Sequence, residues 1–92
     1  MAWRIEIERA AAKELDQLDP PAARRILRFL HERLAPLEDP RSLGEALTGS
    51  KLGDFRKYRI GDHRVIAALR DQQLVVLVVR IRRRDSVYRR PV

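Results

Sequence analysis

The dipeptide Gly61-Asp62 restricts the fold of this chain more than any other feature, because it separates two segments with strand character. Residues 55–60 and 63–70 combine aromatic, β-branched and other apolar residues with interspersed charges. A two-residue hairpin turn requires a positive φ angle, which glycine adopts without steric cost. The sequence therefore predicts a β-hairpin over residues 55–70.

The short turn also fixes which residues of the hairpin stand opposite one another. Arg59 is expected opposite Arg64, and Lys57 opposite Ile66. Side chains alternate between the two faces of a sheet, so the hairpin residues fall into two sets. One face carries Phe55, Lys57, Arg59, Arg64, Ile66 and Ala68, and the other carries Tyr58, Ile60, Val65, Ala67 and Leu69. The second set is apolar and is predicted to pack against helices.

Changes in hydrophobic period before the hairpin indicate one strand and two helices. Trp3, Ile5 and Ile7 alternate with charged residues, as in a half-buried strand. Two helical stripes follow, formed by Ala11, Leu15 and Leu18 and then by Ala23, Ile26, Leu27, Leu30 and Leu34. The helices are separated by Asp19-Pro20-Pro21, in which Asp19 is expected to cap the second helix.

The segments on either side of the hairpin complete the expected topology. Residues 36–53 are rich in proline, glycine and polar residues and predict a loop, with Leu43 and Leu47 as anchors onto the body. Residues 74–81 are apolar on both faces, as in a central strand. The expected fold is α+β in the order β-α-α-β-β-β, with two antiparallel helices on one face of a small, mostly antiparallel sheet and a short C-terminal turn or helix. We expect a single domain over residues 1–92.

The net charge of +7 is confined to the second half of the chain. Residues 1–46 hold eight basic and nine acidic residues, whereas residues 47–92 hold twelve basic and four acidic residues. Such a local excess indicates an anion-binding surface. Polyanions and acidic proteins are therefore the first partners to consider.

Three cations, Lys57, Arg59 and Arg64, share the hairpin face that the helices are not expected to cover. Like charges on neighbouring strands repel one another by a few tenths to about 1 kcal/mol, and no acidic residue of the hairpin lies on this face. The run Arg80-Ile81-Arg82-Arg83-Arg84 is expected to join the same sheet. Taken singly, each cation is also typical of a solvated surface, but together they predict a site for an anion.

Most other chemistry is excluded by composition and spacing. The chain has no cysteine, so it lacks disulfides, thiolate metal sites and cysteine nucleophiles. His31 and His63 lack the spacing of a metal site, and no serine has the context of an acyl-transfer triad. No metal or cofactor is expected. The remaining classes are binding a polyanion, or cleaving one by electrostatic stabilisation.

The chain carries no recognisable targeting segment or membrane span. Its first residues mix apolar and charged side chains without an apolar targeting stretch. The longest apolar run, residues 74–79, is far too short to cross a bilayer. A cytoplasmic localisation is expected.

Three segments together resemble the RelE/ParE toxin superfamily. They are Leu43-Gly44, the hairpin run Lys57-Tyr58-Arg59-Ile60-Gly61-Asp62-His63-Arg64-Val65-Ile66, and Ile81-Arg82-Arg83-Arg84 with Val87-Tyr88-Arg89. The resemblance covers nearly the whole chain and is most RelE-like at its C-terminal end. It implies a microbial-ribonuclease-type fold and the toxin of a type II toxin–antitoxin system. It further implies ribosome-dependent cleavage of mRNA in the A site and a small, acidic, RelB-like antitoxin as partner, besides the ribosome and mRNA.

The resemblance also assigns roles to individual residues. The catalytic positions of RelE-type toxins match Lys57, Arg59, Arg64, Arg84 and Tyr88, with Arg83 as the alternative to Arg84. The neighbouring arginines expected to bind RNA phosphates are Arg56, Arg82, Arg83 and Arg89.

Metal-free RNA cleavage uses the 2′-hydroxyl as nucleophile on the adjacent phosphate, so it needs a base, an acid and cations. Arginine stays protonated, which leaves Lys57 or Tyr88 as the base. Two other interpretations remain. One is a ParE-like toxin that inhibits DNA gyrase by binding protein, and the other is a nucleic-acid-binding module without catalysis.

Overall fold

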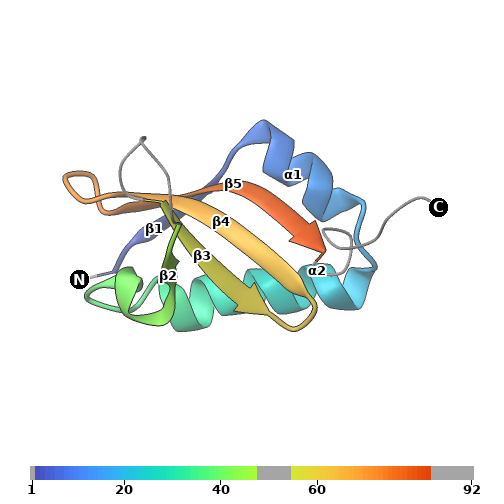
Figure 1. Ribbon diagram of the computed structural model, residues 1–92, viewed down its shortest axis with the longest axis horizontal. Helices are drawn as coiled ribbons and strands as arrows, with labels where there is room; N and C mark the ends of the chain where they lie inside the picture. Colours follow the sequence, from blue (N-terminus) through green and yellow to red (C-terminus); the bar gives the residue numbers. More distant parts are fainter. Residues whose placement is uncertain (1, 48–54, 84–92) are drawn as a thin grey trace.

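A computed structural model describes residues 2–47 and 55–83 of the chain, which form helices packed on a five-stranded sheet (Figure 1). The predicted α+β fold is confirmed. The elements in chain order are β1 (Arg4–Ile7), α1 (Arg9–Asp16), α2 (Pro20–Arg28), η1 (Phe29–Leu34), η2 (Pro40–Leu43), β2 (Glu45–Ala46), β3 (Phe55–Ile60), β4 (His63–Arg70) and β5 (Val75–Arg83).

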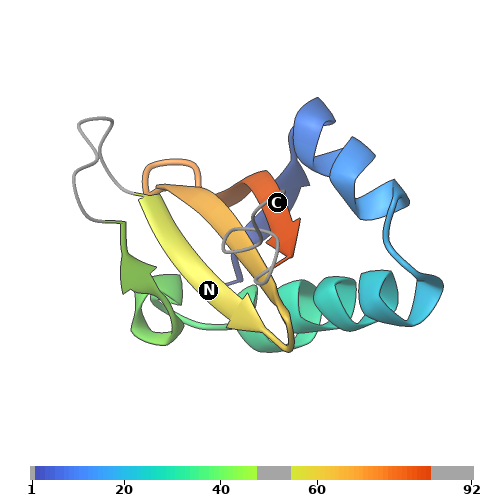
Figure 2. The ribbon, with the colours of Figure 1, turned by 45° about the vertical axis from the view of Figure 1, so that its right-hand side comes forward.

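The sheet has the strand order β1-β5-β4-β3-β2. The strand β1 pairs with β5 in parallel, and the other neighbours pair antiparallel. The strand β5 is therefore internal, as its apolar run predicts. The two helices lie in the connection between β1 and the rest of the sheet, and α1 runs beside β5 (Figures 1 and 2).

The helices cover the apolar face of the hairpin as predicted. Their buried residues are Ala11 in α1, Ile26 in α2, and Leu30 and Leu34 in η1. The sheet residues that meet them, Tyr58, Ile60, Val65, Ala67 and Leu69, are at most 6% exposed. This arrangement leaves the opposite face of β3, β4 and β5 free of helices (Figure 2).

The turn between the helices lies where the proline pair predicts it. The helix α2 begins at Pro20, and Asp19 occupies the N-cap position. The Asp19 side chain makes no capping hydrogen bond, and its backbone carbonyl accepts from Ala23 at 3.0 Å. The two helices diverge from this turn in Figure 2.

The prediction of a loop over residues 36–53 was wrong in part, because η2 and β2 lie within this segment. The strand β2 pairs with the first half of β3, so the described sheet has five strands and not four. A strand of two residues is too short to produce a detectable alternation in the sequence.

The expected anchoring of this segment by Leu43 was also wrong, since Leu43 is 42% exposed. Pro40 is buried instead, and its carbonyl accepts a hydrogen bond from the Tyr58 hydroxyl at 2.9 Å. Leu47, the second predicted anchor, is partly buried, and its backbone N–H donates to the carbonyl of Phe55 at 3.2 Å. The anchoring groups are thus a proline ring and backbone atoms.

The bounds of the last described strand differ from the predicted residues 74–81. Leu74 has a φ of 53° and closes the turn after β4. Its backbone N–H donates to the backbone carbonyl of Asp71 at 3.2 Å. The strand continues to Arg83, which brings two more arginines into the sheet. No helix of the described residues is long and apolar enough to cross a membrane.

Candidate functional site

The hairpin turn forms as predicted and sets the geometry of the site. Gly61 has a φ of 59°, the left-handed conformation that glycine adopts readily. Arg59 stands opposite Arg64 and Lys57 opposite Ile66, which is the predicted register. The three cations of the hairpin therefore share the face away from the helices.

A bulge in β5 brings two further cations to this face. The register shifts between Ile66, which stands opposite Arg80, and Ala67, which stands opposite Val78. Val79 is the extra residue, and it reverses the alternation of side chains along β5. The residues after Val79 therefore point to the opposite face from the one they would occupy in an unbroken strand. As a result Ile81 joins the buried face, and Arg80 and Arg82 join the exposed one.

The outcome is a cationic face that spans three strands. We use this name for Lys57 and Arg59 of β3, Arg64 of β4, and Arg80 and Arg82 of β5. Arg59, Arg64 and Arg82 form one row across the sheet, because each stands opposite the next. The sequence indicated the hairpin part of this face, and the register adds the β5 part.

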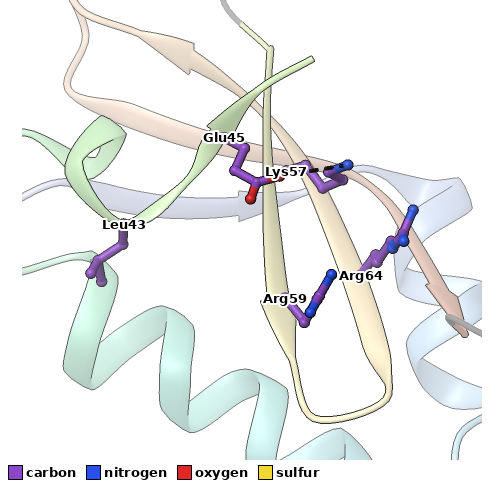
Figure 3. A pocket seen from close by; sticks show the side chains of 5 residues that line it. All are labelled: Leu43, Glu45, Lys57, Arg59 and Arg64. Atoms are coloured by element: carbon purple, nitrogen blue, oxygen red, sulfur yellow. Dashed lines mark ion pairs between the residues drawn. The ribbon is translucent and has the colours of Figure 1, made fainter. Parts of the chain in front are cut away.

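A pocket of about 130 Å³ lies on the cationic face near β2. It is lined by Leu43, Glu45, Lys57, Arg59 and Arg64, which Figure 3 shows projecting from η2 and neighbouring strands. Three of the five lining side chains are cationic. The pocket therefore has the charge to hold a phosphate group.

Glu45 is a site residue that the sequence analysis missed. Its carboxylate lies 3.7 Å from the Nζ of Lys57 and partly offsets the repulsion expected on this face (Figure 3). The carboxylate comes from β2 and not from the hairpin, so the hairpin residues alone gave no sign of it. Only the pairing of Glu45 with Lys57 in the sheet register identifies it.

Close packing holds β2 and Glu45 beside the pocket. A Cβ atom at Gly44 would lie 2.7 Å from the Cε1 of Tyr58, so only glycine allows the chain to approach this ring. Arg41 of η2 binds Asp71 in the turn after β4, with nitrogen–oxygen distances of 2.6 and 3.0 Å. The Arg41 guanidinium lowers the pKa of the Asp71 carboxyl through this hydrogen bond.

A second carboxylate, Glu14 of α1, fixes the β5 end of the cationic face. Its Oε1 accepts the backbone N–H of Ile81 at 2.7 Å. Its Oε2 lies 3.0 Å from the Nη1 of Arg80 and 3.4 Å from the Nε of Arg82. The strand β1 pairs only with residues 75–78 of β5. The Glu14 side chain therefore contacts the part of β5 that extends past the end of β1.

Two predicted phosphate-binding residues do not lie on the cationic face. Arg56 stands opposite Ala67 and so shares the helix-covered face. Arg83 stands opposite His63 and lines a depression with Asp19 and Asp62 beside the interhelical turn. Arg84, Tyr88 and Arg89 lie outside the described residues.

Tyr58 is the tyrosine of the described segments, and it has a structural role. Burial raises the pKa of its phenol to about 12. The hydroxyl donates to the carbonyl of Pro40, and the ring lies 6.2 Å from that of Phe29. A buried phenol that resists ionisation is a poor base, so Tyr58 is not a catalytic candidate. Among residues 2–47 and 55–83, no group of acidic and histidine side chains suits a metal ion.

Comparisons with known proteins agree with this geometry. Residues 5–88 match the sequence model of the ParE toxin of the type II toxin–antitoxin system parDE. No curated protein sequence matches the chain significantly.

Solved structures share the fold. The Mycobacterium tuberculosis toxin–antitoxin complex RelBE2 contains a chain with 20% identity and a TM-score of 0.80, over 91% of this chain and 100% of that one. The archaeal RelE–RelB complex from Pyrococcus horikoshii OT3 gives 28% identity and a TM-score of 0.66, over 91% and 97%. The isolated E. coli RelE toxin gives 22% identity and a TM-score of 0.71, over 95% and 92%.

Proposed function

The chain belongs to the ParE toxin family of type II toxin–antitoxin systems, within the RelE/ParE superfamily, and we propose that it cleaves mRNA in the ribosomal A site. The observation that carries this proposal is the cationic face, which gathers five basic side chains from three strands, three of which line an open pocket. A surface of this kind suits a phosphodiester and the charge that builds up on it during cleavage.

The proposed reaction needs no metal or cofactor. A base removes the proton of the 2′-hydroxyl, the 2′-oxygen attacks the adjacent phosphorus, and the P–O5′ bond breaks. The products are a 2′,3′-cyclic phosphate and a 5′-hydroxyl, whose proton comes from an acid. Arg59, Arg64 and Arg82 would hold the phosphate oxygens, because their guanidinium groups stay charged throughout. Arg84 and Arg89 are proposed as further phosphate contacts, whereas Arg56 and Arg83 lie off the cationic face and could reach only phosphates away from the pocket.

Three side chains are candidates for the base. Lys57 lies in the pocket and would act in its neutral form, while Tyr88 would act as a phenolate. Glu45 is the third candidate, because an ionised carboxylate next to Lys57 can accept a proton at neutral pH. Ordinary lysine and tyrosine side chains carry little of the basic form at neutral pH, and an ordinary carboxylate is a weaker base than histidine. Activity should therefore depend on the ribosome to position the RNA.

The proposal includes the partners that such a toxin requires. Structural neighbours of this chain are complexes of RelE with RelB antitoxins. We infer that this chain binds a small, acidic, RelB-like antitoxin. The targets of the toxin itself would be the ribosome and mRNA in the cytoplasm. Residues 1–92 would act as one toxin domain.

The match to the ParE model favours one alternative, a toxin that inhibits DNA gyrase by binding protein. Such a toxin has no need of clustered cations on an open sheet face. The cationic face therefore supports the ribonuclease over the gyrase inhibitor.

Primer extension on mRNA from cells expressing the chain tests the proposal. We expect codon-dependent cuts that disappear in Arg64→Gln and persist in Arg70→Gln. Both arginines lie on β4, but Arg70 is at the far end of the strand from the pocket. Inhibition of DNA supercoiling without mRNA cuts would instead establish the gyrase alternative.

A further inference from the structure

A second basic surface lies on the helix side of the hairpin. A groove of about 490 Å³ runs between α2, η1 and the end of β3. Its lining includes four arginines, Arg25, Arg28, Arg33 and Arg59, against one acidic residue, Glu32. We call this surface the helix groove. Its lining carries a net charge of +3, although it lies outside the pocket described above.

The amphipathic pattern of the helix places these arginines outward. Ile26 and Leu30 are buried in the core, so residues 25, 28 and 33 fall on the exposed side of the same helical segment. The Arg25 guanidinium lies against the hairpin turn, because a Cβ at Gly61 would be 2.9 Å from its Nη1. The Arg33 guanidinium lies 5.9 Å from the centre of the Phe29 ring.

The helix groove and the pocket on the cationic face share one lining residue, Arg59. The short strand β2 pairs only with Arg56 and Lys57, so in the described part of the chain no strand pairs with residues 58–60 on that side. An extended ligand can therefore pass from the pocket, over this open edge of β3, to the exposed face of α2.

Three of the cations along this path make no ion pair within the described chain. Arg25, Arg28 and Arg59 form no ion pair with any residue of segments 2–47 and 55–83. Their mutual repulsion is relieved when an external anion with several regularly spaced charges binds.

We propose that the helix groove binds the sugar-phosphate backbone of the RNA whose scissile phosphate occupies the pocket. This inference rests on the proposed function and extends its RNA contact beyond the cleaved bond. An acidic protein is the alternative occupant, but four arginines against two large apolar lining residues, Phe29 and Ile60, favour a ligand with a charge on every unit. The one large apolar side chain that is exposed in the described chain, Leu43, lines the pocket and not the groove.

Fluorescence anisotropy with a labelled twelve-residue 2′-O-methyl RNA tests the proposal. This probe lacks the nucleophile, so its binding is measured whether or not the chain cleaves RNA. The matched variants are Arg25→Gln/Arg28→Gln on α2 and Arg9→Gln/Lys13→Gln on α1. Each removes two exposed positive charges from one helix.

The α2 variant should bind the probe roughly tenfold more weakly or worse, since contacts to charged groups are lost. The slope of log affinity against log salt should fall by about 1.4, or about 0.7 for each lost phosphate contact. The α1 variant should keep most of the affinity. Arg25→Lys/Arg28→Lys should restore the slope, which distinguishes phosphate contact from a folding defect.

Equal losses in the α1 and α2 variants would overturn the proposal, because total charge would then explain them. Unchanged RNA affinity with weakened antitoxin binding would also overturn it and would assign the groove to an acidic protein. If mRNA is cut in cells but the α2 variant binds RNA normally, the groove proposal fails and the proposed function stands. If mRNA is not cut but the α2 variant loses RNA affinity, the proposed function fails and the groove is supported only as a site for an RNA backbone that is not cleaved.

Discussion

The carboxylate of Glu45 lies 3.7 Å from the ammonium group of Lys57, although eleven residues separate the two in the chain. This contact places a negative charge in a pocket whose other charged side chains are cationic. Glu45 therefore competes with any anion for Lys57, or helps to move a proton once the anion is bound.

Replacing Glu45 with glutamine separates these two roles. If Glu45 only competes, Glu45→Gln should bind 2′-O-methyl RNA roughly two- to fivefold more tightly, since an exposed ion pair is weak. Glu38→Gln, an exposed change outside the pocket, should leave affinity unchanged. Wild-type affinity in Glu45→Gln would contradict the competition, and a loss of mRNA cleavage with normal binding would identify Glu45 as the base.

Lys57→Ala should reduce the rate of ribosome-dependent mRNA cleavage by about 10²- to 10⁴-fold if Lys57 transfers a proton. Single-turnover cleavage on programmed ribosomes measures this rate. Lys13→Ala on the exposed face of α1 is the matched control and should cleave normally. Tyr88→Phe should be measured alongside, because the base is the residue whose loss removes the rising, low-pH limb of the pH–rate profile. Full toxicity in both variants would count against the catalytic assignment.

The hairpin was predictable from sequence because its turn is encoded locally. Gly61 needs a positive φ, and the two-residue loop then fixes the pairing of Arg59 with Arg64. The helices were predictable for a similar reason, since their apolar stripes follow the helical period.

The remaining parts of the site depend on contacts between distant segments. The strand β2 is two residues long, and its pairing with β3 depends on the fit of Gly44 against Tyr58. The bulge at Val79 changes the direction of Arg80 and Arg82, and the apolar run around it gives no sign of the shift. Glu14 contacts β5 across more than sixty residues of sequence. Patterns within one segment cannot reveal such contacts.

Gly44→Ala should destabilise the fold by about 1–3 kcal/mol, the typical cost of overpacking. The added methyl would lie 2.7 and 2.9 Å from two ring carbons of Tyr58, and that ring is buried and cannot move aside. Thermal unfolding should show a Tm lowered by about 4–8 °C per kcal/mol for a domain of this size. Ala46→Ser, at an exposed position of β2, should leave Tm nearly unchanged. An unaltered Tm in Gly44→Ala would mean that β2 can shift away from the ring.

Tyr58→Phe should change how stability depends on alkaline pH. Burial raises the pKa of Tyr58 from 10 in the unfolded chain to about 12 in the fold. Only the unfolded chain then ionises between these values, so stability is intact below pH 10 and falls as pH rises toward 12. The loss is on the order of 2–3 kcal/mol.

Urea unfolding at pH 8, 10 and 11 measures this difference. Tyr58→Phe should lose about 0.5–1.5 kcal/mol at pH 8, because the hydrogen bond to Pro40 is absent, and should lose less than the wild type on going to pH 11. Tyr88→Phe is the matched control and should keep the wild-type pH dependence. Identical slopes for Tyr58→Phe and the wild type would show that this phenol does not govern alkaline stability.

Glu14→Gln and Glu14→Ala should differ in stability, because only one of them removes the acceptor for the Ile81 N–H. Glutamine keeps an oxygen at the position that lies 2.7 Å from this nitrogen and loses only the ion pairs with Arg80 and Arg82. Those pairs are partly exposed, so Glu14→Gln should cost less than about 1 kcal/mol. Glu14→Ala leaves a partly buried N–H without its acceptor and should cost about 1–3 kcal/mol. Urea unfolding measures both values, and Glu8→Ala, an exposed change just before α1, is the control. Equal losses in the two Glu14 variants would assign the stabilisation to the arginines and not to the β5 backbone.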